Sequence, residues 1–219
     1  MSENPFRYPK LDSIYQQYLA DENSAEFVDR VASCYTLSTL ERLASSGKRI
    51  SRRAAVMALG FLGNYRNNEI FGRALIDPDR AVRLLADHGI REIWQRQGTP
   101  GQQAAVQQLY RLVAQSQMDE VIDLSSELIR ENPKLGEVWN QRAIAYCFEG
   151  YFEAAIDDCL ETLNCNRFHF PAAMGIGHCQ LQLEDTVAAL DSFRLALKIN
   201  PDLDGIRHQI TQLEKILED

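Results

Sequence analysis

The chain has 219 residues, of which 45% are hydrophobic and 25% charged, and its formal net charge is −8. This length suffices for one elongated or two compact domains, and the longest uncharged apolar run is too short to cross a membrane. The opening residues 1–7 lack the apolar core and cleavage site of a secretory leader. Five cysteines without a C-x-x-C pair favour reduced, buried thiols over a disulfide framework. Composition therefore predicts a soluble cytoplasmic protein.

Charge is distributed unevenly along the chain. Residues 101–219 contain 9 Lys+Arg against 19 Asp+Glu, a balance of −10, whereas residues 1–100 contain 14 against 12, a balance of +2. Within residues 42–96 the counts are 11 basic against 5 acidic, a balance of +6. Such asymmetry concerns partners rather than fold. One hypothesis it leaves open is self-association, in which the basic half of one copy meets the acidic half of another.

The first 34 residues are predicted to form short helices that cap the repeats of residues 35–97. Two prolines interrupt any helix within the first nine residues, and residues 11–19 have the pattern of a short amphipathic helix. Asn23 and Glu26 have the spacing of a capping box, with Asn23 as the cap. The helix that they open is expected to run to about residue 32 and to bury Phe27. We assign residues 1–34 to this N-terminal cap.

Residues 35–97 contain two similar helical hairpins. The run Arg52-x-x-Ala55 returns as Arg83-x-x-Ala86, 31 residues later. Helices are expected over residues 37–44, 51–63, 70–75 and 81–94, with a turn at 77–79. The acidic turn followed by Val82-Arg83-x-x-Ala86 resembles a HEAT-type repeat, and the first copy resembles it without the acidic turn. The resemblance implies a stacked pair of HEAT-like repeats.

The second half of the chain has a fixed period. Asn132-Pro133, Asn166-Arg167 and Asn200-Pro201 follow one another at intervals of 34 residues. A period of this length is typical of helical hairpins that stack, because each hairpin needs neighbours to cover its apolar face. Arg167 replaces the proline of the other two dipeptides, so the junction there is expected to be looser.

Divided at this period, the second half gives units at 102–135, 136–169 and 170–203. In the second unit Trp139, Ala143, Tyr146, Gly150 and Ala155 fall at helix-contact positions, and the third has Phe193-x-x-Ala196 before Asn200-Pro201. These runs resemble the tetratricopeptide repeat (TPR). Residues 204–219 have helical spacing and are expected to cap the stack, while the Gly/Pro-rich residues 98–101 are the expected linker. The prediction is an all-α helical-repeat solenoid: HEAT-like helices, three TPR units and a capping helix.

No catalytic constellation is found in the sequence. A phosphate-binding loop, an H-E-x-x-H run and a G-x-S-x-G elbow are all missing, and the four histidines are scattered. We therefore predict no enzymatic activity and no cofactor. Metal ligands could come from Cys147, Cys159, Cys165, Cys179 and His178, but their helix positions predict that they do not converge, so small buried thiols are the preferred interpretation.

Two acidic pairs, Asp157-Asp158 and Glu184-Asp185, also carry groups used in acid/base chemistry. Neighbouring residues on a helix point about 100° apart, so the first pair does not converge on one atom. The second pair falls at a turn. We interpret both pairs as solvated faces.

The TPR resemblance implies a concave groove, lined by the first helix of each unit, that binds an extended or helical peptide. Carried over by position, the groove consists of Val106, Tyr110, Asn140, Gln141, Ile144, Phe148, Met174, His178 and Leu181. It has amide groups for a peptide backbone and little charge. The clamp for acidic chaperone tails needs lysine, asparagine and arginine, and at its positions this chain has Val106, Tyr110, Gln141, Pro171 and Gly175. A chaperone-tail adaptor is therefore disfavoured.

The basic segment 42–96 supports the alternative hypothesis, a nucleic-acid-associated helical-repeat protein. Its candidate phosphate contacts are Arg49, Arg52, Arg53, Arg80, Arg83 and Arg91. Interleaved acidic residues, a lack of stacking aromatics and a pI near 5.1 disfavour nucleic acid as a partner. Arg52 and Arg83 also fit internal ion pairs between repeats. The preferred hypothesis is a non-enzymatic scaffold or adaptor that binds a peptide or protein segment in the TPR groove.

Overall fold

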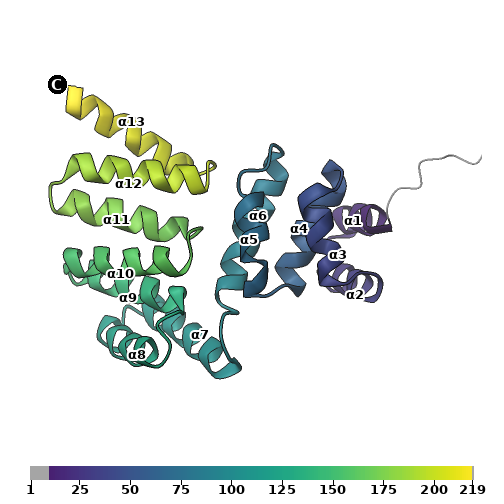
Figure 1. Cartoon of the computed structure of the whole chain (residues 1–219), viewed down its shortest axis with the longest axis horizontal. Helices are drawn as coiled ribbons and strands as arrows, with labels where there is room; N and C mark the ends of the chain where they lie inside the picture. Colours follow the sequence, from purple (N-terminus) through teal and green to yellow (C-terminus); the bar gives the residue numbers. More distant parts are fainter. Residues whose placement is uncertain (1–9, 219) are drawn as a thin grey trace, which may run out of the picture. The chain divides into compact units, whose positions relative to one another are not determined.

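The computed structural model describes residues 10–218, which form thirteen α-helices and one short 3₁₀ helix and contain no β-strand (Figure 1). The chain divides into two compact units, Met1–Ile93 (the N-terminal unit) and Trp94–Asp219 (the C-terminal unit). No helix within residues 10–218 is long and apolar enough to cross a bilayer. The all-α prediction is confirmed for these residues. Two other predictions concern residues outside the described range, namely that two early prolines interrupt any helix and that residues 1–7 lack a secretory leader.

The helices of the N-terminal unit follow one another with short connections. Their bounds are α1 (Lys10–Asp21), α2 (Ser24–Cys34), α3 (Leu37–Ser46), α4 (Arg49–Leu62), the 3₁₀ helix η1 (Tyr65–Asn67), α5 (Asn68–Ala74) and α6 (Arg80–Trp94). Helices α1, α2 and α3 all pack against α4, whose central residues are buried. Asn23 caps α2 as predicted, since its side chain accepts from the Glu26 backbone N–H at 3.1 Å. In a complete capping box the Glu26 side chain would accept a hydrogen bond from the Asn23 backbone N–H. Here that N–H donates to Asp21 Oδ1 instead.

A glycine on α6 provides space for the largest side chain of the neighbouring helix α5. A Cβ atom at Gly89 would lie 2.4 Å from Cε1 of Phe71, a ring that is fully buried. The two elements can therefore approach closely only because residue 89 has no side chain. The expected helical hairpins of residues 35–97 are present, but their assignment as HEAT-like repeats remains a prediction.

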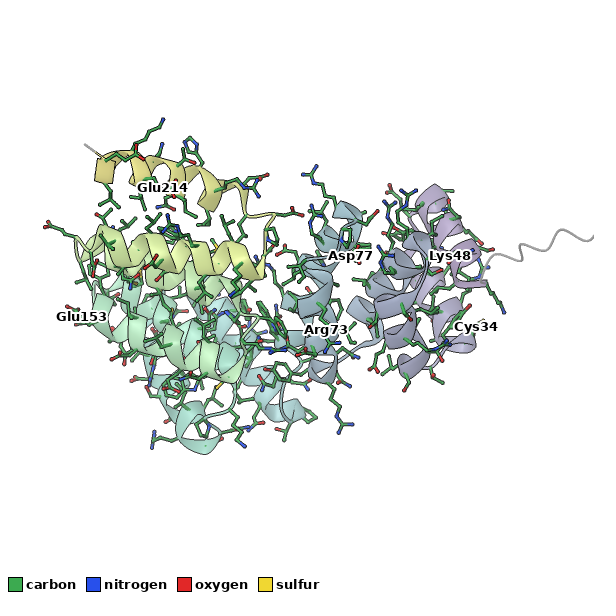
Figure 2. The ribbon with its side chains drawn as sticks, turned by 45° about the horizontal axis from the view of Figure 1, so that its top comes forward. Cys34, Lys48, Arg73, Asp77, Glu153 and Glu214 are labelled. Atoms are coloured by element: carbon green, nitrogen blue, oxygen red, sulfur yellow. The ribbon has the colours of Figure 1, made fainter. Side chains whose placement is uncertain are left out.

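The segment between α5 and α6 is held by arginines of α4. Arg52 binds Asp77 through two hydrogen bonds of 2.8 Å, and Arg53 binds Asp79 through bonds of 2.9 and 2.7 Å. Asp77 is labelled in this segment in Figure 2. Asp79 also accepts from the Val82 N–H at the start of α6. The predicted pairing of Arg52 between successive hairpins is confirmed by its bonds to Asp77. Arg83 donates to the carbonyl of Asp77.

The C-terminal unit consists of three helix pairs and a last helix. The bounds are α7 (Pro100–Ala114) with α8 (Met118–Glu131), α9 (Gly136–Phe148) with α10 (Phe152–Cys165), α11 (Phe170–Gln182) with α12 (Thr186–Ile199), and α13 (Asp204–Glu218). Within this unit the pairs stack in chain order, and α13 packs on α12 (Figure 1). Each predicted TPR unit thus contains one helix pair. The first helix starts inside the expected linker, because Thr99 and Gln102 form a capping box before Pro100.

The 34-residue period has a direct structural cause at the junctions between pairs. Asn132, Asn166 and Asn200 each accept a hydrogen bond from the backbone N–H two residues later, at 3.2, 3.1 and 3.1 Å respectively. This local turn is one that asparagine side chains favour. The bond at Asn166 is as short as that at Asn200, so Arg167 in place of proline does not give the looser junction that its sequence predicts.

The turns inside the pairs repeat at the same interval. Ser116, Gly150 and Glu184 all have a positive φ, of 58°, 82° and 61° respectively. Only glycine adopts this conformation without steric cost, so the serine and the glutamate are held there by the helices on either side. The positive φ therefore recurs in these turns, although the residue type differs from one turn to the next.

Helix α11 approaches α12 closely through another glycine. A Cβ atom at Gly177 would lie 2.6 Å from Cε1 of Phe193, which is fully buried. One acidic residue differs from expectation in the same unit. Asp158 is buried and binds Arg142 at 2.7 and 2.9 Å, so only Asp157 of that pair lies on a solvated face.

Candidate functional site

A cavity of about 350 Å³ opens in the C-terminal unit. It is formed by α9 and α11, with Cys159 contributed by α10. Its lining consists of Asn140, Ala143, Ile144, Cys147, Phe148, Cys159, Pro171, Gly175, His178 and Cys179. On both α9 and α11 these residues recur every three or four positions, which places them on one face of each helix. Small residues create the space: a Cβ atom at Gly175 would lie 3.1 Å from Cys159 Sγ.

The cavity is apolar and partly open to solvent. Phe148 is 65% exposed and Ile144 40% exposed, so two large apolar side chains of the lining are in contact with solvent. None of the lining residues is an acid, a lysine or an arginine. Burial lowers the pKa of His178, so its imidazole is neutral at physiological pH. The site therefore suits an uncharged, apolar group.

Four of the nine predicted groove residues line this cavity: Asn140, Ile144, Phe148 and His178. The other five lie elsewhere in the C-terminal unit. Val106 is buried in the core between α7, α8 and α9, and Met174 and Leu181 pack against the apolar cluster of α12 and α13. Tyr110 and Gln141 are held by a buried carboxylate, that of Glu137.

Glu137, a residue that the sequence interpretation missed, lies at the centre of a buried polar cluster. Its Oε1 accepts hydrogen bonds from Tyr110 Oη at 2.8 Å, Gln141 Nε2 at 2.8 Å and Asn140 Nδ2 at 3.2 Å. Its Oε2 lies 3.1 Å from His169 Nε2. Burial alone would raise the pKa of Glu137, but the hydrogen bonds from His169, Gln141 and Tyr110 outweigh it, so the net shift is downward. The carboxylate is ionised.

His169 has a defined tautomer. Its Nδ1 accepts the backbone N–H of Ala172 at the start of α11, so the ring proton must be on Nε2, which donates to Glu137. The ring of Trp94 stacks on His169 with centroids 4.2 Å apart. The cluster thus links α7, α9 and the residue preceding α11. Part of this cluster is visible in the sequence, because the spacing of residues 137, 140 and 141 places them on one face of a helix.

Three of the five thiols line the same cavity, although the expectation concerned convergence on one metal ion. Cys147, Cys159 and Cys179 all line it, while Cys165 donates to the carbonyl of Pro133. Burial raises the pKa of Cys159, and burial together with the neighbouring Cys147 raises the pKa of Cys179 to about 12. Protonated thiols are poor nucleophiles and poor metal ligands. Among residues 10–218 no group of three or more Cys, His, Asp or Glu is placed to hold a metal.

Four of the six arginines of the predicted basic surface lie within ion-pair distance of an aspartate. Besides the Arg52 and Arg53 pairs, Arg49 lies 3.9 Å from Asp79 and Arg91 lies 3.5 Å from Asp87. Of the remaining two candidates, Arg83 binds backbone carbonyls and Arg80 is exposed. The six arginines therefore do not form a continuous set of free cations.

No family model matches the chain. Among solved structures, it is similar to the first TPR domain of Spaghetti (RPAP3) bound to an HSP90 peptide, with 20% identity over 53% of this chain and 92% of that one and a TM-score of 0.51. The first TPR domain of human RPAP3 gives 20% identity over 52% and 90% with a TM-score of 0.49, and YrrB, a TPR protein with an unusual peptide-binding site, gives 15% over 91% and 98% with a TM-score of 0.46. Together with the helix pairs repeated every 34 residues, the first likeness establishes that about half of the chain has a TPR-type helical-repeat fold.

Proposed function

We propose that the chain is a non-enzymatic interaction scaffold whose C-terminal unit binds a peptide or protein segment in the cavity between α9 and α11. The observation that carries this proposal is the uncharged cavity of about 350 Å³, at which Phe148 and Ile144 stay exposed. Apolar pockets of this size with few polar groups are the usual form of a binding site. The TPR domain of Spaghetti was solved with a bound peptide, and we infer the same class of ligand here.

The chemistry of the cavity argues against catalysis. A catalytic cysteine needs a lowered pKa, whereas burial raises the pKa of Cys159 and Cys179. His178, next to Cys179 in the chain, packs edge-on against the Phe193 ring at 5.0 Å between centroids. An apolar cavity lined by protonated thiols supports binding rather than bond making.

Two finer assignments belong to the same proposal. We propose that residues 35–97 are HEAT-like repeats that contribute a second surface, and that the protein acts in the cytoplasm, where its five thiols stay reduced. The paired arginines of α4 and α6 give no support to the nucleic-acid alternative, because charges already bonded to aspartates are not available to phosphates.

The test is selection of a random linear peptide library on the purified protein. Phe148→Asp introduces a charge at the cavity, and Leu160→Asp is the matched control, because Leu160 is a 47% exposed residue of α10 outside the cavity lining. Selected peptides should bind Phe148→Asp at least about tenfold more weakly, since burial of one large apolar side chain contributes about 1.5–3 kcal/mol. Leu160→Asp should bind like the wild type. Equal binding by both variants would refute the cavity as the site.

A further inference from the structure

Asn140 contributes a side-chain amide to the lining of the cavity, and this amide has only one allowed orientation. It lies on α9, is 7% exposed and lines the cavity. Its Nδ2 lies 3.2 Å from Glu137 Oε1. An ionised carboxylate can only accept hydrogen bonds, so the NH₂ side of the amide must face Glu137. The carbonyl oxygen Oδ1 is thereby directed away from the carboxylate.

Glu137 is itself immobile. Donors from α7, from α9 and from the residue preceding α11 hold its two oxygens, and the residue is 3% exposed. A carboxylate held by several donors cannot turn to release Asn140 without losing bonds that each contribute to stability. The cluster is therefore a rigid support beneath one polar atom of the cavity.

Asn140 Oδ1 has no hydrogen-bond donor among residues 10–218, in which the single hydrogen bond of the Asn140 side chain is the one to Glu137. It is also not among the buried atoms that lack a partner, so it remains accessible. An accessible, oriented acceptor beside an apolar cavity is able to accept a hydrogen bond from an N–H group of a ligand. A peptide backbone provides such a group next to each side chain.

Charge further restricts the ligand. No cation lines the cavity, and the ionised Glu137 lies directly behind Asn140. On the second helices α8 and α10 the exposed acidic residues are Asp119, Glu120, Asp123, Glu127, Glu131, Glu153, Asp157 and Glu161. Glu153, in the first turn of α10, is labelled in Figure 2. A carboxylate entering the cavity would lose water and meet no cation there, whereas an apolar side chain has no such charge to desolvate.

We propose that Asn140, positioned by Glu137, is the specificity-determining residue of the cavity. The ligand is a peptide segment that inserts an uncharged, Leu-, Met- or Phe-sized side chain and donates its adjacent backbone N–H to Asn140 Oδ1. Acidic anchors, including acidic C-terminal tails, are rejected. This inference rests on the proposed function, since it names the chemistry of the segment that the same cavity binds.

The experiment uses the strongest peptide selected from the random library on the full chain. Each backbone N–H of that peptide is replaced in turn by N–CH₃, and binding is measured to wild type, Asn140→Leu and Glu137→Gln. One N-methylation should weaken wild-type binding about three- to tenfold, the range of one hydrogen bond. Asn140→Leu should bind the unmethylated peptide about as weakly and be insensitive to that same methylation. Glu137→Gln, which can also donate, should reduce the sensitivity because Asn140 is free to turn.

The outcomes separate this inference from the proposed function. Selected peptides that bind Phe148→Asp and Leu160→Asp equally well would refute both. Cavity-dependent peptides with an acidic anchor, or equal sensitivity to N-methylation in wild type and Asn140→Leu, would refute the role of Asn140 alone. Loss of sensitivity cannot be attributed to unfolding, because it is read as a ratio between two peptides on the same variant, and the helical spectrum of each variant provides the second check.

Discussion

The two units use the same packing device but differ in where their polar groups are bonded. In each, a helix glycine receives a buried phenylalanine ring: Gly89 receives Phe71 and Gly177 receives Phe193. The N-terminal unit then satisfies its charges at the turn before α6, where Arg52 and Arg53 bind aspartates. The C-terminal unit also makes such a pair, between Arg142 and Asp158, but in addition it buries Glu137 among several donors beside an uncharged cavity.

This difference indicates where a partner can bind. Arg52 and Arg53 are already bonded to aspartates within the unit, so these two candidates for phosphate contacts are less available to a ligand than their sequence suggests. In the C-terminal unit the polar groups are used to orient Asn140, while Ile144 and Phe148 remain exposed. Net charge alone would have pointed to the N-terminal unit, whereas the site that we propose lies in the C-terminal unit.

The largest effect should follow removal of the two matched rings. Phe193→Ala and Phe71→Ala each delete a fully buried side chain, and each should lower the free energy of unfolding by about 3–5 kcal/mol. Urea unfolding followed by circular dichroism measures both. Tryptophan fluorescence should detect Phe193→Ala, because Trp94 and Trp139 both belong to the C-terminal unit. A loss below about 1 kcal/mol in either variant would contradict the packing that we describe.

The glycine side of the same contact should give a smaller effect. Gly177→Ala places a Cβ atom 2.6 Å from the Phe193 ring and should destabilise by about 1–3 kcal/mol, despite the better helix propensity of alanine. Gly205→Ala on α13 is the control, because nothing lies within 4 Å of its Cβ position. That control should be neutral or stabilising by up to about 1 kcal/mol. Similar changes in both variants would mean that the close approach is not what limits residue 177.

How much of this could be predicted from the sequence depends on the range of the interaction. The period is visible because Asn132, Asn166 and Asn200 make a local turn within two residues. The start of α7 has a local signal too, since Thr99 and Pro100 are typical of a helix N-terminus, although the same residues also suit the linker that we expected there. Local chemistry of this kind can be read directly from residue spacing.

The cavity could be predicted only in part. The TPR resemblance implied a groove that included Asn140, Ile144 and Phe148, but the approach of Cys147 to Cys159 and Cys179 depends on how the helices cross. The contact between Glu137 and His169 joins residues 32 positions apart, and no spacing rule predicts it. Because burial of Glu137 requires donors from separate helices, its role becomes apparent only once the helices are packed.

The stability of the N-terminal unit should depend on pH through the ion pair between Arg53 and Asp79. The hydrogen bond from Arg53 holds the pKa of Asp79 at about 2, below the ordinary value of 3.8. A lowered folded-state pKa means that this stabilisation is complete above pH 3.8 and is lost as the pH falls toward 2. Asp79→Asn, which retains a good helix cap, should remove this part of the acid sensitivity in urea midpoints measured over that range. An unchanged pH profile would show that the Arg53–Asp79 pair does not stabilise the fold.

The smallest effect should come from an exposed pair. Arg73, labelled in Figure 2, binds Glu69 one turn away, with the two side chains 69% and 42% exposed. Arg73→Ala should change the free energy of unfolding by less than about 0.5 kcal/mol. Arg52→Ala, which breaks two bonds to Asp77, should cost more in the same unfolding assay. The reverse order would contradict the view that the α4 arginines hold the turn.

The most direct test of the central claim is methyl NMR of the full chain titrated with the selected peptide. Binding in the cavity should shift the Ile144 methyl signals first, while those of the exposed Ile76 and Leu84 in the N-terminal unit and of Leu160 on α10 stay in place. Shifts confined to Ile76 and Leu84, with Ile144 unmoved, would place the binding surface in the N-terminal unit and contradict the proposed site.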